Sequence, residues 1–361
     1  MKALLLTRYD TLGASSRLRM MQYVPALTDL GIGCAVEPLL PDGYLAALYA
    51  GRRLPAGEVA CAYARRIAII AQRTDADVVW LEKEALPWVP WPLERALTRL
   101  GVPIVVDIDD AVFHRYDRHG AALVRRLLGS KIDHLFAAVA AVTAGNDYLA
   151  ARARSAGAVR VERIPTVVDA ARYPVRPPPG AAPFTIGWVG SPATEMYLSS
   201  LAGVLREMVE RGARVLLVGA SPAALPGLPV ERRAWNADRE ASDIAEFDVG
   251  IMPLADSPWE RGKCAYKIVQ YMAAGRAVVA SPIGANRVVV SPGEDGLLAD
   301  STEEWAAALV SLMEDRAAAA RLGAGGRRKV EREYTLQVQA PRVAAVLRAA
   351  ARMTRAPETG P

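Results

Sequence analysis

Short apolar runs alternate with longer helix-forming stretches along almost the whole chain. Apolar runs of this length, bounded by turn residues, are typical of parallel strands that are buried on both faces. The stretches between them would then supply the crossover helices. The alternation therefore predicts an α/β protein built on parallel, doubly wound sheets. The expected strands are Ala3–Thr7, Cys34–Pro38, Val78–Leu81, Ile104–Ile108, Ala141–Thr143, Thr185–Val189, Arg214–Val218, Val249–Met252 and Ala277–Ala280.

Helices are expected between these strands, and several of them end at a glycine that suits a helix C-cap. These glycines are Gly31, Gly101, Gly157 and Gly275. The expected helices are Arg17–Leu30, Ala60–Gln72, Leu93–Leu100, Val124–Ala138, Asp147–Ala156, Tyr197–Glu210, Cys264–Ala274, residues 303–321 and a last helix that reaches about Met353.

A proline-rich segment, PVRPPPGAAP from Pro174 to Pro183, interrupts the alternation. It can continue neither a helix nor a central strand, so we expect a linker there. A chain of 361 residues is long for one core and comfortable for two domains. The predicted organisation is an N-terminal domain over residues 1–175, a linker over 176–183, a second domain over 184–340, a C-terminal helix over 341–355 and a disordered tail over 356–361.

The composition is that of an ordinary globular protein, with 52% hydrophobic and 23% charged residues. The formal net charge of +5 is mild, and arginines are scattered among acidic residues in both halves. This pattern indicates no nucleic-acid-binding stripe, and it leaves open a peripheral contact with an anionic membrane. Oligomeric state does not follow from the sequence.

Cysteine and histidine positions indicate neither a disulfide framework nor a metal site. Three cysteines lie far apart, and the three histidines lack metal-ligand spacing with them. The opening MKALLLTRYD has too short an apolar run for a signal peptide, and no stretch approaches the roughly 20 apolar residues that span a bilayer. We therefore expect a cytoplasmic protein, with the inner face of the membrane as an alternative location.

The stretch from Trp259 to Asp300 combines a basic turn, a helix, a buried strand and a glycine-containing turn. Lys263 and Lys267 are four residues apart, so within a helix that starts at Cys264 they would share one face near its beginning. A helix N-terminus already favours anions. Two cations at that point predict a seat for a diphosphate.

The segment from Gln270 to Asp300, QYMAAGRAVVASPIGANRVVVSPGEDGLLAD, resembles the donor-binding segment of GT-B fold glycosyltransferases, specifically the retaining enzymes of family 4. The resemblance implies two Rossmann-like domains facing across a cleft. It places a nucleotide-sugar donor on the C-terminal domain and the acceptor on the N-terminal one. It also implies that the last helix, with Arg342–Arg352 as the candidate, crosses back to the N-terminal domain.

The sequence departs from that family at its paired glutamates, which fall on Gly262 and Gln270. In the family the first glutamate touches the sugar and the second the ribose. We interpret the chain as a variant branch in which lysines supply charge to the donor site. The resemblance then assigns Lys263, Tyr266, Lys267 and Gln270 to donor binding, and Glu240 to the ribose.

Loops that follow expected strands supply the other donor-binding candidates. Gly13, Ser15 and Arg17 follow the first strand, where a flexible loop before a helix can let a phosphate approach the backbone. Arg17 is the favoured phosphate ligand, since a guanidinium binds phosphate in a forked manner. The alternative is an ordinary turn with Ser15 or Ser16 as N-cap. Three further groups lie where the family contacts the donor: Gly190 with Ser191, Thr194, and Ala285 with Asn286.

The run VVDIDD from Val105 to Asp110 is an apolar strand that ends in acids. Carboxylates at the C-terminal edge of a parallel strand face the ligand crevice. The alternatives are sugar contacts as in family 4, a metal-binding DxD as in GT-A enzymes, a DxD phosphatase centre, or simple helix capping. We favour Asp109 and Asp110 as substrate-facing residues, and we assign them with Lys267 to catalysis.

Acceptor-binding candidates come from the end of another strand and from a nearby histidine. Glu82, Lys83 and Glu84 follow Val78–Leu81, and His114 comes shortly after the acidic pair. A solvated charged loop and a plain loop histidine are the alternatives.

The resemblance to family 4 implies that the protein is a glycosyltransferase. The expected reaction moves a sugar from a UDP- or GDP-type nucleotide sugar to the hydroxyl of a sugar, lipid-linked or small-molecule acceptor, with retention and without metal or cofactor. Two alternatives stay open. One is a nucleotide-sugar epimerase or DxD phosphatase, and the other is a non-catalytic nucleotide-sugar binding protein.

Overall fold

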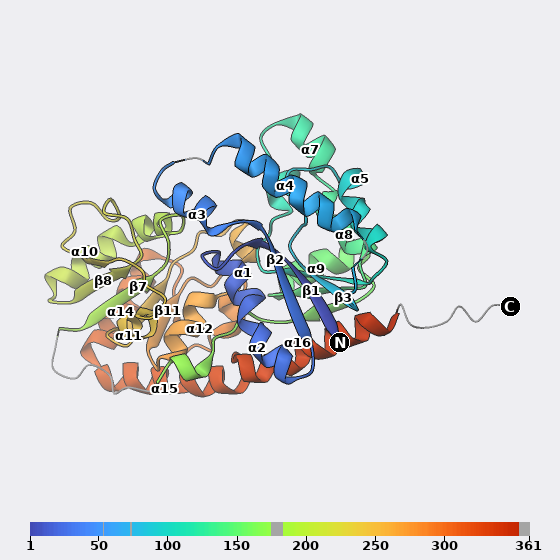
Figure 1. Ribbon diagram of the computed structural model, residues 1–361. Helices are drawn as coiled ribbons and strands as arrows, with labels where there is room; N and C mark the ends of the chain where they lie inside the picture. The colour runs from blue at the N-terminus through green and yellow to red at the C-terminus, as the bar shows by residue number, and fades with distance from the viewer. Residues whose placement is uncertain (53, 73, 175–182, 354–361) are drawn as a thin grey trace. The chain divides into compact units, whose positions relative to one another are not determined.

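The computed structural model describes residues 1–52, 54–72, 74–174 and 183–353, and it divides into two compact units (Figure 1). The first unit comprises Met1–Thr166, Gly262–Cys264 and the chain from Gln339 onward. The second comprises Val167–Arg261 and Ala265–Val338. The expected tail over 356–361, and all of the expected linker except its last residue, lie outside the described residues.

The first unit is built on a parallel sheet with the strand order β2-β1-β3-β4-β5-β6. Its strands are β1 Lys2–Tyr9, β2 Gly33–Leu40, β3 Val78–Glu82, β4 Ile104–Ile108, β5 Ala141–Ala144 and β6 Val161–Arg163. Its helices are α1 Ala14–Arg19, α2 Val24–Asp29, α3 Asp42–Tyr49, α4 Ala56–Ala71, α5 Trp91–Glu94, α6 His114–Asp117, α7 Ala122–Leu128, α8 Lys131–Ala138 and α9 Asp147–Ser155, with 3₁₀ helices η1 Met21–Tyr23 and η2 Arg95–Leu100. Helices α2 and α4 pack against β2 from opposite sides (Figure 1).

The second unit has a parallel sheet with the order β12-β11-β10-β7-β8-β9, which is the strand order of the Rossmann fold. Its strands are β7 Thr185–Val189, β8 Arg214–Val218, β9 Glu231–Arg233, β10 Val249–Met252, β11 Ala277–Ala280 and β12 Leu297–Leu298. Its helices are α10 Ala202–Glu210, α11 Glu240–Ile244, α12 Tyr266–Ala273, α13 Asn286–Val289, α14 Thr302–Glu314 and α15 Arg316–Glu333, and its 3₁₀ helices are η3 Ala170–Arg172 and η4 Glu195–Leu201. Two further helices, η5 Glu260–Gly262 and α16 Leu336–Met353, begin in this unit and end in the first.

Both faces of the second sheet are buried, as the apolar runs predict. Along β8, Val215 and Leu217 belong to one hydrophobic core, while Leu216 and Val218 belong to the other. Alternate side chains of a strand point to opposite faces, so a strand covered on both sides needs a continuous apolar sequence. The bounds expected for β4, β7, β8, β10 and β11 are confirmed.

Strand order reverses once in each sheet, and the position of this reversal indicates where a ligand site can form. The reversal lies between β1 and β3 in the first unit and between β7 and β10 in the second. In open α/β sheets the two connections at such a point leave in opposite directions, so ligands bind outside the carboxyl ends of those strands. The loops after β1, β3, β7 and β10 are therefore the places to look for a site.

Two glycines let aromatic rings pack directly on the strands at the reversal in the second unit. A Cβ on Gly187 would lie 2.1 Å from the Phe247 ring, and one on Gly250 would lie 2.3 Å from the Tyr271 ring. The Tyr271 hydroxyl accepts a hydrogen bond from the amide of Val189 (3.0 Å) and donates one to the carbonyl of Ile251 (3.4 Å). Tyr271 thus bridges the ends of β7 and β10, where the strands begin to diverge.

Several expected helices are divided into shorter ones in the structure. The helix expected over Arg17–Leu30 is α1, η1 and α2 in succession, and that expected over Val124–Ala138 is α7 and α8. The helix expected over residues 303–321 ends at Glu314 and a new one starts at Arg316, because the Asp315 side chain caps the second by accepting from the amide of Ala318.

The boundary between the two units lies before the proline-rich segment in which the linker was expected. It falls between Thr166 and Val167, because the following residues pack on the second unit. Val168 pairs with Thr335, and the Tyr173 hydroxyl accepts a hydrogen bond from Gln270 (3.0 Å). At the other end of the chain, α16 belongs to the first unit from Gln339 onward, as the resemblance implies for the last helix.

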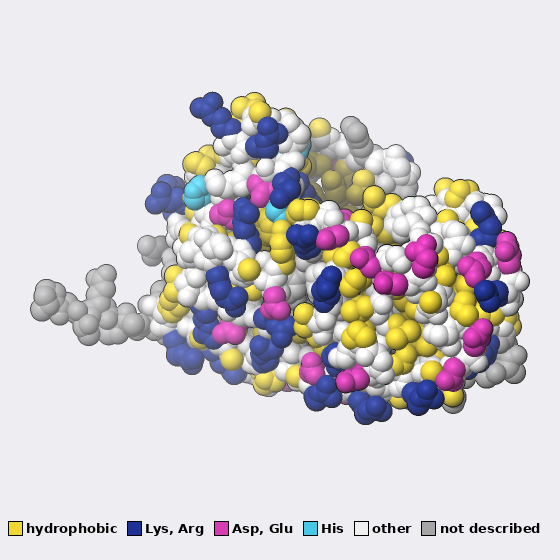
Figure 2. Space-filling view, turned by 180° about the vertical axis from the view of Figure 1, so that it is seen from behind, with side chains coloured by type: hydrophobic (Ala, Val, Ile, Leu, Met, Phe, Trp, Pro, Cys, Tyr) yellow, Lys and Arg dark blue, Asp and Glu magenta, His cyan; other side chains and the backbone are white. Residues whose placement is uncertain are grey.

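Surface charge is dispersed. Lys and Arg side chains lie between acidic and apolar ones across the face drawn in Figure 2. Among the described residues no helix is long and apolar enough to cross a membrane.

Substitution of Gly250 by alanine tests the packing at the strand reversal. The new methyl group would overlap the Tyr271 ring, so Gly250→Ala should lower the free energy of unfolding by roughly 1–3 kcal/mol. Gly203→Ala is the matched control, because Gly203 is exposed in α10 with no atom within 4 Å of the added Cβ, and it should be neutral or stabilising by up to about 1 kcal/mol. Urea unfolding measures both. Equal effects of the two substitutions would contradict the packing argument.

Candidate functional site

The loop between β1 and α1 is held close to the strand that precedes it. Gly13 precedes the first residue of α1, and a Cβ there would lie 2.4 Å from the Cβ of Tyr9. No side chain caps this helix, and Ser15 and Ser16 lie inside its first turn. The alternative in which one of these serines is the N-cap is therefore wrong.

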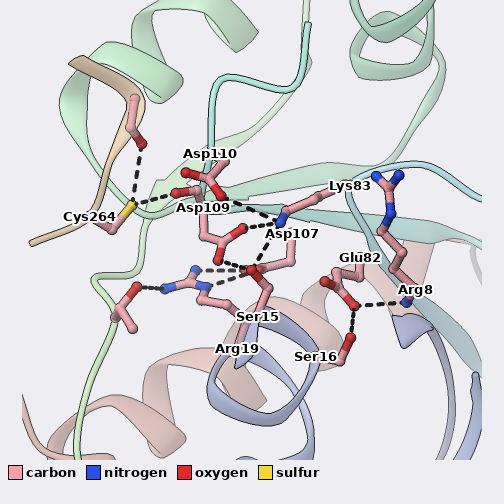
Figure 3. A network of polar contacts seen from close by, with 12 residues as sticks. Arg8, Ser15, Ser16, Arg19, Glu82, Lys83, Asp107, Asp109, Asp110 and Cys264 are labelled. Atoms are coloured by element: carbon pink, nitrogen blue, oxygen red, sulfur yellow. Dashed lines mark hydrogen bonds and ion pairs between the residues drawn. The ribbon is translucent and has the colours of Figure 1, made fainter. Parts of the chain in front are cut away.

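The two serines instead bind acidic side chains at the ends of neighbouring strands (Figure 3). Ser16 donates to Oε2 of Glu82 (2.6 Å), which also accepts from the amide of Arg8 (2.8 Å). Ser15 donates to Oδ2 of Asp109 (2.7 Å). Glu82 is buried, and burial raises the pKa of its carboxyl above the ordinary value. The loop after β1 is thereby tied to the carboxyl ends of β3 and β4.

Lys83 completes this cluster. Its Nζ donates to the Ser15 hydroxyl (2.9 Å) and lies 2.9 Å from Asp109 and 3.7 Å from Asp110. Burial lowers the Lys83 pKa, but the carboxylates of Asp109, Asp110 and Glu82 together outweigh burial and hold that pKa above its ordinary value. Burial likewise raises the Asp109 pKa, yet Lys83, Arg19 and the hydrogen bond from Ser15 together outweigh burial and hold that pKa below its ordinary value. With φ at 60°, Lys83 also adopts a left-handed backbone that is uncommon outside glycine.

Residues 262–264 extend the cluster within the first unit. Lys263 Nζ lies 3.5 Å from Asp110, and the carbonyl of Lys263 accepts from Asn146 (2.9 Å). The Cys264 thiol donates to the carbonyl of Asp109 (3.1 Å), and burial raises its pKa well above the ordinary range. Because Ala265 is left-handed (φ 55°), α12 begins only at Tyr266. The prediction that Lys263 and Lys267 share one helix face is therefore wrong.

Asp107 has a different partner from its neighbours. The Arg19 guanidinium binds both of its oxygens, at 2.9 and 2.7 Å, and Thr143 donates to one of them (2.6 Å). Arg19 also donates to the carbonyl of Ile164 (2.8 Å). Arg19 and Asp107 are each about 1% exposed. The carboxylate is thus fully occupied, and a role as a nucleophile or as a metal ligand would break this pair.

Two expected acceptor-binding residues lie apart from this cluster. Glu84 has a fully buried side chain that accepts from Tyr116 (2.8 Å) and pairs with Lys131 (2.7 Å). It is a core residue, so the prediction that it contacts an acceptor is wrong. The His114 ring nitrogens are engaged by Asp117 (2.8 Å) and by the Tyr148 hydroxyl (2.7 Å).

Arg17 is bound within its own loop. Its guanidinium donates to the carbonyl of Thr11 (2.8 Å), at the surface of its own loop. The arginine that enters the cluster is Arg19, two residues later.

In the second unit, the loop after β7 is shaped by Trp188. A Cβ on Gly190 would lie 2.3 Å from the Trp188 ring, so only glycine fits there. Ser191 and Thr194 close a turn in which the amide of Thr194 donates to the carbonyl of Ser191 (2.8 Å). Lys267, in the first turn of α12, places its Nζ 5.6 Å from the centre of the Trp188 ring. Lys267 and Gly190 thus both lie against the Trp188 ring at the strand reversal.

The other donor-binding candidates lie deeper in the second unit. Glu240 accepts from the indole of Trp235 (2.7 Å), and Gln270 donates to Tyr173 (3.0 Å). Asn286 is buried and donates to the carbonyl of Ser281 (2.9 Å), and the neighbouring Ala285 is buried as well. Tyr266 is half-buried at the start of α12. Burial, with the nearby charge of Glu240, raises the pKa of Tyr173.

Comparison with known proteins supplies the family context. Residues 183–315 match the protein family described as "Glycosyl transferases group 1". HepE of Anabaena, solved with UDP and glucose, shares the fold with a TM-score of 0.71 at 16% identity, covering 97% of this chain and 100% of that one. The chain has the GT-B fold.

Two more GT-B glycosyltransferases show the same likeness. Sucrose-phosphate synthase of Thermosynechococcus elongatus has a TM-score of 0.72 at 14% identity, covering 97% of this chain and 98% of that one. WaaG, a glycosyltransferase involved in lipopolysaccharide biosynthesis, has a TM-score of 0.68 at 13% identity, covering 96% and 99%. A search of curated protein sequences gave no match.

Sequence reasoning missed several residues that build the two polar regions of this GT-B protein. Arg19 and Cys264 carry no motif of their own, and Trp188 and Tyr271 look like ordinary core residues in an apolar stretch. Glu260 brings a buried carboxylate, which accepts from the Tyr197 hydroxyl (2.5 Å), into the loop after β10. The sequence signal for Glu260 is its position two residues before Gly262, where the first glutamate of family 4 falls.

Removal of the Lys83 charge tests the cluster in the first unit. Lys83→Met keeps much of the side-chain volume but leaves Asp109 without its cation, so the free energy of unfolding should fall by roughly 3–5 kcal/mol. A second change, Asp109→Asn, should recover a large part of this loss, since a neutral amide needs no counter-charge. Urea unfolding of the single and double variants measures the coupling.

Lys263→Met is the control, because its longer and more exposed contact with Asp110 should be worth less than about 1 kcal/mol. A double variant as unstable as Lys83→Met alone would contradict the assigned pairing.

Proposed function

We propose that this protein transfers a glycosyl group from a nucleoside diphosphate sugar to an acceptor hydroxyl. One observation carries the proposal. The segment that matches the group 1 glycosyltransferases, residues 183–315, forms a Rossmann-ordered unit whose strand reversal bears Gly190 and Lys267. A basic residue at the start of a helix, next to a glycine that lets a ligand come close to the backbone, is suited to bind a diphosphate.

In this proposal, the ammonium group of Lys267 stabilises the negative charge of the leaving diphosphate. Its ammonium lies against Trp188 at the end of β7, and the hydroxyls of Ser191 and Thr194 belong to the adjoining turn. HepE was solved in complexes with UDP and with UDP-glucose, which makes a UDP sugar the first donor to test, with a GDP sugar as the second.

The acceptor is proposed to bind the first unit beside Asp109 and Asp110. Their side chains are 13% and 27% exposed, so unlike Glu84 they can be reached from solvent. Lys83 fixes Asp109 from within the fold. Carboxylates held in this way can accept hydrogen bonds from the hydroxyls of a sugar or of another alcohol.

Metal independence and retention of configuration are further parts of the proposal. Lys83 and Lys263 already compensate Asp109 and Asp110, and Lys267 supplies charge for the diphosphate. In the proposed reaction the acceptor oxygen bonds to the anomeric carbon as the bond from that carbon to the phosphate oxygen breaks. The acceptor proton passes to the leaving phosphate. The resemblance to family 4 supports retention.

The alternatives are less well supported. A phosphatase centre on the DxD motif would need Asp107 as its nucleophile, and Arg19 holds both oxygens of that carboxylate. A protein that binds nucleotide sugars without turnover is the alternative prompted by Gly262 and Gln270, and turnover assays with added acceptors separate it from a transferase.

Replacement of Lys267 tests the donor site. Lys267→Ala should weaken binding of the nucleoside diphosphate by about 10- to 100-fold, since a hydrogen bond to a charged group contributes roughly 1.5–3 kcal/mol. Lys267→Arg retains the charge and should bind more tightly than the alanine variant. Isothermal titration calorimetry measures both. Unchanged affinity of Lys267→Ala would remove this residue from the donor site.

A nucleotide panel tests donor class and metal dependence together. Thermal unfolding with UDP, GDP, ADP or TDP should show one nucleotide that stabilises the protein, by roughly 2.7 kcal/mol at 100 times its dissociation constant. The shift should persist in EDTA. Loss of the shift in EDTA would overturn metal independence and direct attention to Asp109 and Asp110, and no shift with any nucleotide would count against the donor site.

A further inference from the structure

Helix α7 turns two large apolar side chains away from the core. Leu123 is 66% exposed and Leu127 is 55% exposed, and their spacing of four residues places them on one face of the helix. Leu128, on the other side of the helix, is 6% exposed and fixes the helix to the unit. A single exposed leucine is ordinary, but contiguous apolar side chains rimmed by polar ones occur at protein and membrane interaction sites.

An exposed tryptophan belongs to the same region. Trp88 is 48% exposed, and its ring packs edge-on against Tyr116 (5.3 Å between ring centres) and His119 (5.8 Å), both in the segment that leads into α7. The region therefore presents two leucines and an indole. Tryptophan is the side chain that favours an interface between apolar and aqueous surroundings.

The charges around these side chains are almost all positive. Arg118, Arg125 and Arg126 are exposed, and within the part of the chain that the structure describes no acidic side chain lies within ion-pair distance of them. The nearby Asp117 is already engaged, by His114 (2.8 Å) and Arg152 (3.2 Å). One guanidinium nitrogen of Arg125 donates to the carbonyl of Gly120 (2.8 Å) and so braces the turn before α7.

We propose that α7 and the turn before it form a docking surface for a membrane that contains anionic lipids. The leucines and Trp88 would enter the level of the headgroups, while the arginines bind lipid phosphates. In Figure 2 the top of the view, where α7 lies, shows apolar side chains flanked by basic ones. This inference does not depend on the proposed transferase activity.

Charge complementarity selects this occupant over a second copy of the chain. A two-fold dimer through α7 would bring like surfaces together and place the arginines of both copies close to one another. Since Arg118, Arg125 and Arg126 are paired with no acid on this face, repulsion would oppose that contact. An anionic bilayer supplies the missing negative charge and also accepts the apolar side chains.

Vesicle flotation of the full chain tests the proposal. The protein should float with vesicles of phosphatidylcholine and phosphatidylglycerol at low salt, should not float with phosphatidylcholine alone, and should be released as salt is raised. Arg118→Gln with Arg126→Gln should lower partitioning about 30-fold, because each basic side chain near an anionic surface contributes about 1 kcal/mol, or roughly fivefold. Leu123→Ser with Leu127→Ser should also weaken binding.

The control carries the same kinds of change elsewhere on the surface. Val159→Ser with Arg321→Gln replaces an exposed apolar and an exposed basic side chain away from α7, and its binding should be unchanged. Thermal unfolding checks that each variant is folded. Equal flotation with neutral vesicles, or unchanged flotation of both α7 variants, would overturn the proposal. A dimer that dissociates in Leu123→Ser with Leu127→Ser, without any vesicle binding, would assign the surface to self-association instead.

Discussion

The buried ion pair between Arg19 and Asp107 is the constraint on which the first unit depends. Removing both charges from water is costly, and the cost is offset only because the guanidinium meets both carboxylate oxygens and a backbone carbonyl. This pair fixes the end of α1 against β4. Ser15 and Ser16 lie one turn earlier in the same short helix, so their reach to Asp109 and Glu82 follows from that anchor.

The two sheets use the strand reversal in different ways. In the first unit, charged side chains after β3 and β4 neutralise one another, with Lys83 beside Asp109. In the second, aromatic side chains hold the strands, with Tyr271 hydrogen-bonded to the ends of β7 and β10. A network of paired charges leaves carboxylates that can bind hydroxyl groups. In the second unit, the aromatic rings pack directly on Gly187 and Gly250.

The fold was largely predictable, and the site was predictable only in part. Buried parallel strands need continuous apolar runs, which is why β4, β7, β8, β10 and β11 could be placed to the residue. Short strands such as β6 and β9 sit at sheet edges with polar sequences, so no apolar run announced them. For the site, both Asp109 and Glu84 follow strands, but only Asp109 keeps a partly exposed side chain, while Lys131 holds Glu84 in the core.

The sequence by itself determined the two α/β units, their parallel sheets and the strand ends at which polar residues would collect, because local periodicity and turn chemistry act over a few residues. Only the tertiary structure decided which charges are partnered. It joined Arg19 to Asp107, placed Asp107 and Glu84 inside the fold, and left Lys263 outside the helix that carries Lys267. Such pairings join residues dozens of positions apart, and burial rather than sequence spacing sets their energy.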